Sequence, residues 1–181
     1  MLIDSSRCRT FEYALTRPSP CAVGIDPAVV GRANRFSDCL AVSIELEHGD
    51  CGLGAVAAKV IRRVADRTGA THIVIHGFIR PPAAHERARF RIDPLTELAD
   101  ALDLLGEIAE RLTQSGQSVQ LMPFGWYTDI RSDLPESDQG RHSIHLHGGA
   151  DPSRRLVAGL DHPTIRQFRR EAERTATPFS A

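Results

Sequence analysis

The chain has 181 residues, 41% of them hydrophobic and 25% charged, with a formal net charge of −1. This composition is typical of one globular domain with a real core. The balanced charge excludes a global field that would attract nucleic acid, so any RNA contact must use a local basic patch. No apolar run reaches the roughly 18–20 residues that span a bilayer, and the first residues lack the pattern of a signal peptide, so we expect a cytoplasmic protein.

The four cysteines, Cys8, Cys21, Cys39 and Cys51, all lie in the first third of the chain. Their spacings are wide and no CxxC pair occurs, which disfavours a structural zinc site. Free thiols are the default expectation in a reducing compartment. Cys8 is the best candidate for a functional thiol, because it follows the first predicted strand.

The first half of the chain predicts two strands and a helix. Residues 1–5 form a short strand, and the two prolines of residues 17–20 favour a turn. Residues 21–37 have the composition of a loop. The alternating pattern of residues 40–47 predicts a half-buried strand. Residues 54–68 carry apolar side chains at helical spacing, and the glycine that follows them favours the end of a helix.

The second half continues the alternation of strands and helices. Residues 71–78 are rich in β-branched side chains and predict a strand. Residues 79–92 form a basic loop that contains prolines. Asp93, followed by proline, is then the N-cap of a long helix. Two further strands are predicted at residues 119–122 and 143–147.

Strands that alternate with helices favour an α/β fold, in which two main helices pack against one β-sheet. An acidic, polar insertion interrupts this pattern at residues 133–139. We divide the chain into an α/β domain, residues 1–150, and a basic C-terminal extension with helical turns, residues 151–181. The extension is either a solvated helix or a contact surface for RNA or a partner protein.

The most informative segment is residues 121–128, where a short apolar strand leads into Pro123-Phe124-Gly125 and two aromatic residues. Proline fixes φ and glycine permits positive φ, so the chain can turn here and place aromatic side chains beside a cleft. These residues alone fit an ordinary strand end with aromatic core residues equally well. The segment resembles the Pro-Phe-Gly-Tyr-Tyr-Lys signature of the archaeal threonyl-tRNA synthetase editing domain, a relative of D-aminoacyl-tRNA deacylases. Elements in the same order and spacing extend the resemblance over roughly residues 1–150.

The chain departs from this family at its catalytic positions. Thr128 stands where the family has lysine, and Arg80 stands where it has histidine. His145 lies near the position of a family glutamate. The resemblance therefore implies a D-aminoacyl-tRNA deacylase-like scaffold, a similar pocket location and a homodimer, but not the family's usual catalytic groups.

The candidate site residues follow from these positions. Arg80 can bind a phosphate or stabilise a developing oxyanion, and Thr128 can position a water. A histidine with a near-neutral pKa can activate that water for ester hydrolysis. The catalytic candidates are Arg80, Tyr127, Thr128 and His145. The candidates for substrate contact are Phe124, Gly125 and Trp126.

The histidines also permit a metal site. His145 and His147 lie two residues apart in the last predicted strand, so they share one face. Two imidazoles can bind one metal, such as zinc or iron. His76, near the end of another predicted strand, is the candidate third ligand, and Asp4 or Glu45 could contribute. The same histidines also fit polar strand residues that bond to backbone or water.

The leading functional prediction is a freestanding, trans-acting aminoacyl-tRNA deacylase without a cofactor. It would use the 3′ end of tRNA and remove a mischarged amino acid, such as serine on threonine tRNA, because binding alone separates a methyl group by only about 1–3 kcal/mol. One alternative is a metalloenzyme that uses His76, His145 and His147 to act on a small molecule. Another is a non-catalytic module that binds tRNA or a synthetase. We expect contact with neither DNA nor membrane.

Overall fold

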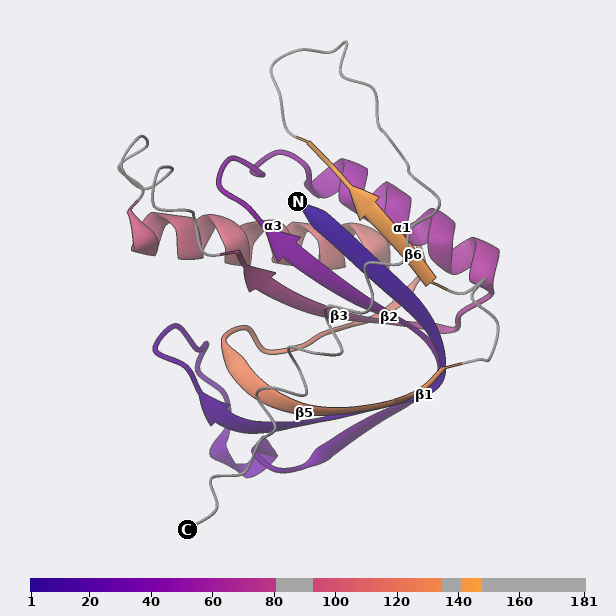
Figure 1. The fold of residues 1–181 in the computed structure, drawn as a ribbon, viewed down its shortest axis with the longest axis horizontal. Helices are drawn as coiled ribbons and strands as arrows, with labels where there is room; N and C mark the ends of the chain where they lie inside the picture. The colour runs from indigo at the N-terminus through magenta and orange to yellow at the C-terminus, as the bar shows by residue number, and fades with distance from the viewer. Residues whose placement is uncertain (81–92, 135–140, 148–181) are drawn as a thin grey trace.

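The computed structural model describes residues 1–80, 93–134 and 141–147 (Figure 1). Three sequence predictions fall wholly or partly outside these residues: the basic loop at 79–92, the insertion at 133–139 and the extension at 151–181. The described part is a mixed α/β domain, in which a curled six-stranded sheet packs against two helices. The predicted α/β architecture is confirmed at this level.

The elements in chain order are β1 (Leu2–Pro18), η1 (Pro27–Val29), β2 (Ala33–Leu46), α1 (Gly54–Thr68), β3 (His72–Ile79), α3 (Pro94–Gln114), β4 (Ser118–Leu121), β5 (Trp126–Asp133) and β6 (Arg141–His145). The described strands form one sheet in the order β4-β3-β2-β1-β5, and β6 also pairs with β1. β2, β3 and β4 are parallel, whereas β1 runs antiparallel to β2, β5 and β6. The carboxyl ends of β2 and β3 therefore meet at one edge of the sheet.

Both helices lie where the sequence predicts them. Gly69 follows α1 in the left-handed conformation with φ 65°, and Asp93 accepts a 3.0 Å hydrogen bond from the Thr96 amide at the start of α3. The strand predictions are less complete. β1 continues to Pro18, β2 begins at Ala33 inside the predicted loop, and β5 is not predicted at all.

α1 and α3 cover one face of the sheet (Figure 1). Alternate residues of the central strands project toward these helices and form the main core. The strand residues that do so include Leu40, Val42, Ile44 and Leu46 of β2 and Ile73 and Ile75 of β3, all buried. Burial of each such side chain contributes about 1.5–3 kcal/mol, so this face fixes the register of the sheet.

β1 and β2 bend together at Arg9 and Asp38. The strand pairing skips these two residues, and Asp38 has a φ of 56°. In a regular strand, residues 8 and 11 would face opposite sides of the sheet. Here Cys8, before the bend, and Phe11, after it, both face a second core, so the alternation of faces shifts by one residue at the bend. The outer parts of β1 and β2, together with β5, therefore curl away from the helices (Figure 1) and enclose this second core, to which neither α1 nor α3 contributes.

Gly77 allows α3 to pack closely on β3. A Cβ at this position would lie 2.3 Å from Cδ1 of Leu105. We expect Gly77→Ala to destabilise the domain by about 1–3 kcal/mol, because the leucine must move within a packed core. Gly106 of α3 faces open space, so Gly106→Ala should instead stabilise by about 0.5–1 kcal/mol. Urea unfolding followed by circular dichroism measures both changes, and a shift of the same sign in both variants would contradict this account.

Candidate functional site

Polar side chains gather on the helix-free face of the sheet, near the carboxyl ends of β2 and β3. Asp4 pairs with Ser43, and Ser43 pairs with His76, so the three side chains project to the same face. Glu45 lies two residues further along β2, roughly 7–8 Å from Asp4 on the diagonal. All four residues, which we call the polar cluster, are partly buried. Ligands of open α/β sheets bind at the carboxyl ends of strands, so the polar cluster is the candidate functional site.

His76 is the titratable group of the cluster that best fits catalysis. Burial lowers the pKa of its imidazole below the ordinary value of 6.5. The ring is therefore neutral at neutral pH and can accept a proton from water. Phe78, the next residue on the same face, lies with its ring centroid 5.9 Å from that of His76. The sequence singles out His76 only as a metal ligand, whereas its position also fits a general base.

The lowered pKa of His76 makes the stability of the fold depend on pH. Between the folded pKa and the unfolded value near 6.5, the unfolded chain binds more protons than the folded chain. The contribution of His76 is therefore complete above the unfolded pKa and is lost as pH falls through the folded pKa. We expect His76→Asn to reduce the fall in Tm between about pH 7 and pH 5, measured by differential scanning calorimetry. An unchanged pH dependence in this variant would contradict the assignment.

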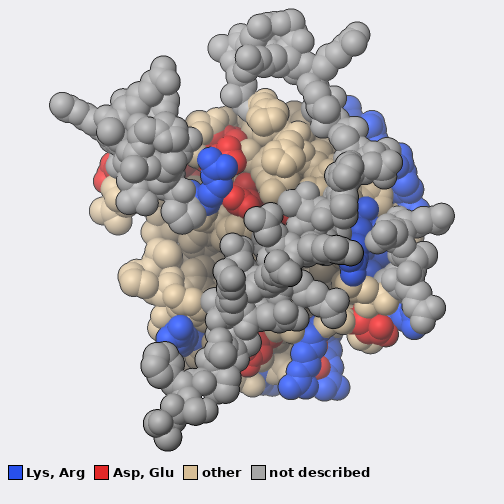
Figure 2. Space-filling view, viewed as in Figure 1, with Lys and Arg blue, Asp and Glu red and all other residues tan. Residues whose placement is uncertain are grey.

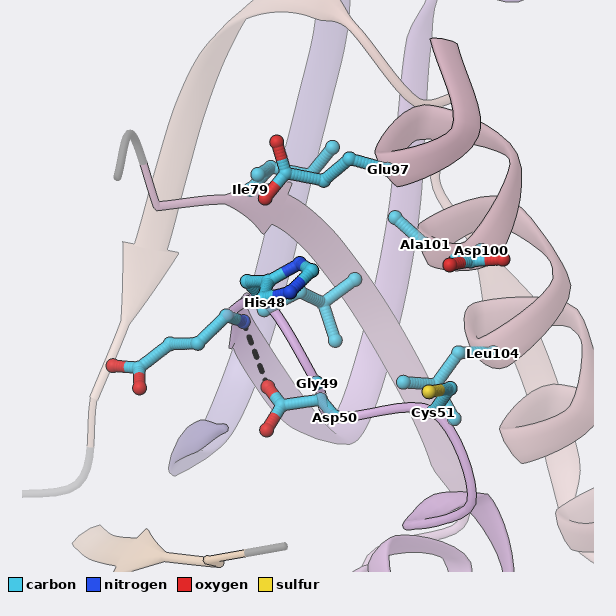
Figure 3. Close-up of a pocket in the computed structure, with 11 residues that line it drawn as sticks. His48, Gly49, Asp50, Cys51, Ile79, Glu97, Asp100, Ala101 and Leu104 are labelled. Atoms are coloured by element: carbon cyan, nitrogen blue, oxygen red, sulfur yellow. Dashed lines mark hydrogen bonds between the residues drawn. The ribbon is translucent and has the colours of Figure 1, made fainter. Parts of the chain in front are cut away.

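An open cleft lies at the same edge, on the helix side of the sheet (Figure 3). The loop after β2 forms one wall, with His48 and Cys51, and α3 forms the other. The cleft is lined by four carboxylates: Glu47, Asp50, Glu97 and Asp100. Asp50 orders the loop, because its Oδ2 accepts a 2.7 Å hydrogen bond from the Glu47 amide. Two of these carboxylates already have cationic partners, because Asp50 lies 2.9 Å from the Met1 amino group and Glu47 pairs with Arg80.

Arg80 lies at the edge of the sheet, directly after β3. Its backbone amide donates a 2.8 Å hydrogen bond to the Leu46 carbonyl, so the main chain holds its position. Its guanidinium lies 3.1 Å from a carboxylate oxygen of Glu47, with exposed fractions of 46% and 37% for the two side chains. An exposed pair of this kind contributes little stability.

The residues predicted to contact substrate also make contacts that hold the fold together. Phe124 is buried in the main core, at 7% exposure. Trp126 packs against the second core, and its Nε1 donates a 2.9 Å hydrogen bond to the Val23 carbonyl. Gly125 has φ 77° and lies against the backbone of Ala22. All three fasten the loop between β1 and β2 to the sheet, and these positions lend no support to a role in substrate contact.

Tyr127 and Thr128 project to opposite faces of β5, because successive strand residues alternate. Tyr127 is 51% exposed, and the guanidinium carbon of Arg17 lies 4.3 Å from its ring centroid. Thr128 pairs with Leu15, which belongs to the second core. The structure therefore does not bring these two predicted catalytic residues together.

His145 and His147 lie close to each other, with ring centroids 6.1 Å apart, and both are exposed. His76 does not join them. β1 and β2 separate β3 from β6, so three strand spacings of about 4.8 Å, or roughly 14 Å, lie between His76 and His145. Within residues 1–80, 93–134 and 141–147, no three His, Cys, Asp or Glu side chains form a group that could hold a metal ion. The predicted ligand set of His76, His145 and His147 is not assembled.

On the face shown in Figure 2, basic and acidic side chains are interspersed rather than gathered into one large patch. Neither α1 nor α3, the two long helices of the described part, is apolar enough over a sufficient length to cross a membrane. A contact with RNA would therefore depend on local groups such as Arg80.

Comparison with known proteins gives one informative match. No protein-family model matches the chain. The chain is 31% identical over 121 residues to the threonine–tRNA ligase of Thermofilum pendens. The match covers 65% of this chain but only 18% of the ligase. The chain is thus distantly related to this ligase and corresponds to less than a fifth of its length.

Proposed function

We propose that the chain is a trans-acting aminoacyl-tRNA deacylase with the fold of the archaeal threonyl-tRNA synthetase editing domain. Its substrate would be threonine tRNA that carries a wrong amino acid, such as serine. The relation to a threonine–tRNA ligase over 121 residues carries this proposal. A match to 18% of that ligase fits a relation through one of its domains.

The polar cluster supplies groups that fit ester hydrolysis. In the proposed reaction, the oxygen of a water attacks the ester carbonyl carbon while His76 accepts a proton from that water. The bond between the carbonyl carbon and the ribose oxygen then breaks. The ribose oxygen takes up the proton, which leaves a free amino acid and a free tRNA 3′ end. The lowered pKa of His76 supports the role of base, and Ser43 in the neighbouring strand can hold the water.

Arg80 is proposed to bind a phosphate near the 3′ end of the tRNA. A guanidinium can form two parallel hydrogen bonds with a phosphate, which a lysine cannot. Its 46% exposure and its exposed partner Glu47 leave it accessible at the edge of the sheet. We assign roles to His76 and Arg80 in place of Tyr127 and Thr128, which face opposite ways.

The proposal is tested by hydrolysis of seryl-tRNA(Thr) and threonyl-tRNA(Thr). We expect the wild-type protein to hydrolyse the serine ester faster by at least about tenfold. Arg80→Ala should raise KM by about 10–100-fold, the usual effect of losing a hydrogen bond to a charged group. Arg17→Ala is the matched control, because it removes an arginine that stacks on Tyr127 away from the polar cluster. Binding of tRNA without turnover would favour the non-catalytic alternative, and neither binding nor turnover would overturn the proposal.

A competing proposal is a metalloenzyme that acts on a small molecule and uses a zinc or iron ion. The exposed pair of His145 and His147, with ring centroids 6.1 Å apart, is the observation in its favour. Elemental analysis by mass spectrometry of the wild type and the His145→Ala/His147→Ala variant separates the two proposals. Near-stoichiometric metal in the wild type alone would favour the metalloenzyme. The homodimer stays a prediction, which static light scattering tests.

A further inference from the structure

Cys8 and Cys39 are direct cross-strand partners in β1 and β2. Such partners have Cα atoms about 4.5–5.5 Å apart, and their side chains lie on the same face. A disulfide requires a Cα separation of about 4.4–6.8 Å, so the backbone geometry suits a bond between them. Both side chains are buried in the second core, at 1% and 0% exposure. Because the two cysteines lie far apart in the sequence, the sequence alone does not indicate that they are in contact.

The two thiols differ in chemical character because they interact. The interaction between the two side chains lowers the pKa of Cys8 and raises the pKa of Cys39, and the Cys8 thiol lies 3.6 Å from the Ser6 carbonyl, to which it donates. The guanidiniums of Arg7 and Arg141 add positive charge near Cys8 and lower its pKa further. A nucleophilic thiol beside a resolving thiol is the arrangement that thiol–disulfide exchange requires.

The pair also lies beside the bend of the sheet. Cys8 and Cys39 directly flank the bend at Arg9 and Asp38. On the other side of β1, and among the described residues, the pairing with β6 ends at Ser6 and the pairing with β5 begins at Thr10. The bend is held by Asp38, whose side chain pairs with Arg7 and whose carbonyl accepts hydrogen bonds from the amide and hydroxyl of Thr71. Because both sulfurs are buried, a small oxidant reaches them only when the strands open locally at this bend.

We propose that Cys8 and Cys39 form a reversible disulfide by exchange with a small disulfide such as oxidised glutathione. The Cys8 thiolate attacks one glutathione sulfur and releases the first glutathione as a thiolate. The Cys39 thiolate then attacks the Cys8 sulfur of the mixed disulfide and releases the second. The two thiol protons pass to the two released glutathiones, which carry the two electrons. The new bond joins β1 to β2 at the bend and fixes the curl that encloses the second core.

The experiment uses the full chain with Cys21→Ser and Cys51→Ser, because these two exposed cysteines would otherwise form mixed products. The folded protein is equilibrated with mixtures of reduced and oxidised glutathione, and free thiols are then alkylated after unfolding. We expect peptide mass spectrometry to find a Cys8–Cys39 cross-link that dithiothreitol reverses. The oxidised protein should show a Tm higher by about 5–10 °C, because the bond restricts the unfolded chain.

Cys39→Ala in the same background is the matched control and should accumulate a stable glutathione adduct on Cys8. Full alkylation of both cysteines after equilibration with oxidised glutathione would overturn the proposal. A glutathione adduct on Cys8 that persists while Cys39 is present would do the same. If Cys39→Ala fails to fold, the cross-link map and the Tm of the parent protein still decide the question.

Discussion

His76→Asn is expected to lower kcat/KM for the hydrolysis of seryl-tRNA by about 10²–10⁴-fold, the usual contribution of a general base. Burial lowers the pKa of the imidazole, so the ring is unprotonated at neutral pH and available to take a proton from water. Asparagine retains a polar side chain of similar size but cannot accept that proton. Single-turnover hydrolysis at saturating protein separates the chemical step from tRNA binding.

His72→Asn is the matched control for this prediction. His72 lies in the same strand and on the same face as His76, but at the exposed start of β3. Its replacement should leave the rate unchanged. The wild-type rate should also fall as pH drops through the His76 pKa, which lies below 6.5, because a protonated ring cannot act as a base. Equal losses in both variants, or a loss in neither, would refute the role of His76.

The helices of this fold could be predicted because their signals are local. An N-cap aspartate, a terminal glycine and apolar residues at helical spacing all lie within one short window. The strands depend on distant partners. The polar residues after Ser5 hide the continuation of β1, because the alternation changes phase at the bend near Asp38. β5 is an edge strand with largely exposed residues, so it lacks the apolar pattern that predicts a buried strand.

The polar cluster could be predicted only in part. Asp4, Glu45 and His76 all attract attention in the sequence as possible metal ligands, but in combination with His145. The strand order places His76 beside Ser43 and away from His145, because β1 and β2 lie between β3 and β6. Ser43 is missed altogether. Its signal was present as a small polar residue that alternates with buried aliphatic residues in a central strand.

Gly125→Ala is expected to destabilise the domain by about 2–5 kcal/mol, the combined cost of a left-handed alanine and of a steric overlap. Gly125 has φ 77°, and a Cβ there would lie 2.7 Å from both the Cα of Ala22 and the carbonyl oxygen of Cys21. These are backbone atoms, which cannot rotate away as a side chain can. The loop between β1 and β2 would therefore have to separate from the sheet.

Gly49→Ala isolates the conformational part of this cost. Gly49 has φ 88°, and a Cβ at this position would meet no atom within 4 Å, so its replacement should cost only about 1–2 kcal/mol. The excess in Gly125→Ala, measured by urea unfolding, then reports the contact with the loop. Equal losses in the two variants would show that this contact contributes nothing.

The backbone around Gly125 explains why that contact should matter. The Ser19 amide donates a 2.9 Å hydrogen bond to the Gly125 carbonyl, and the Val23 amide donates a 3.1 Å hydrogen bond to the Phe124 carbonyl. These two hydrogen bonds attach the loop between β1 and β2 to the Pro-Phe-Gly segment, directly before β5 begins. A scaffold role of this kind does not depend on which groups perform the chemistry. Pro-Phe-Gly can therefore hold the loop to the sheet whichever residues stand at positions 80 and 128.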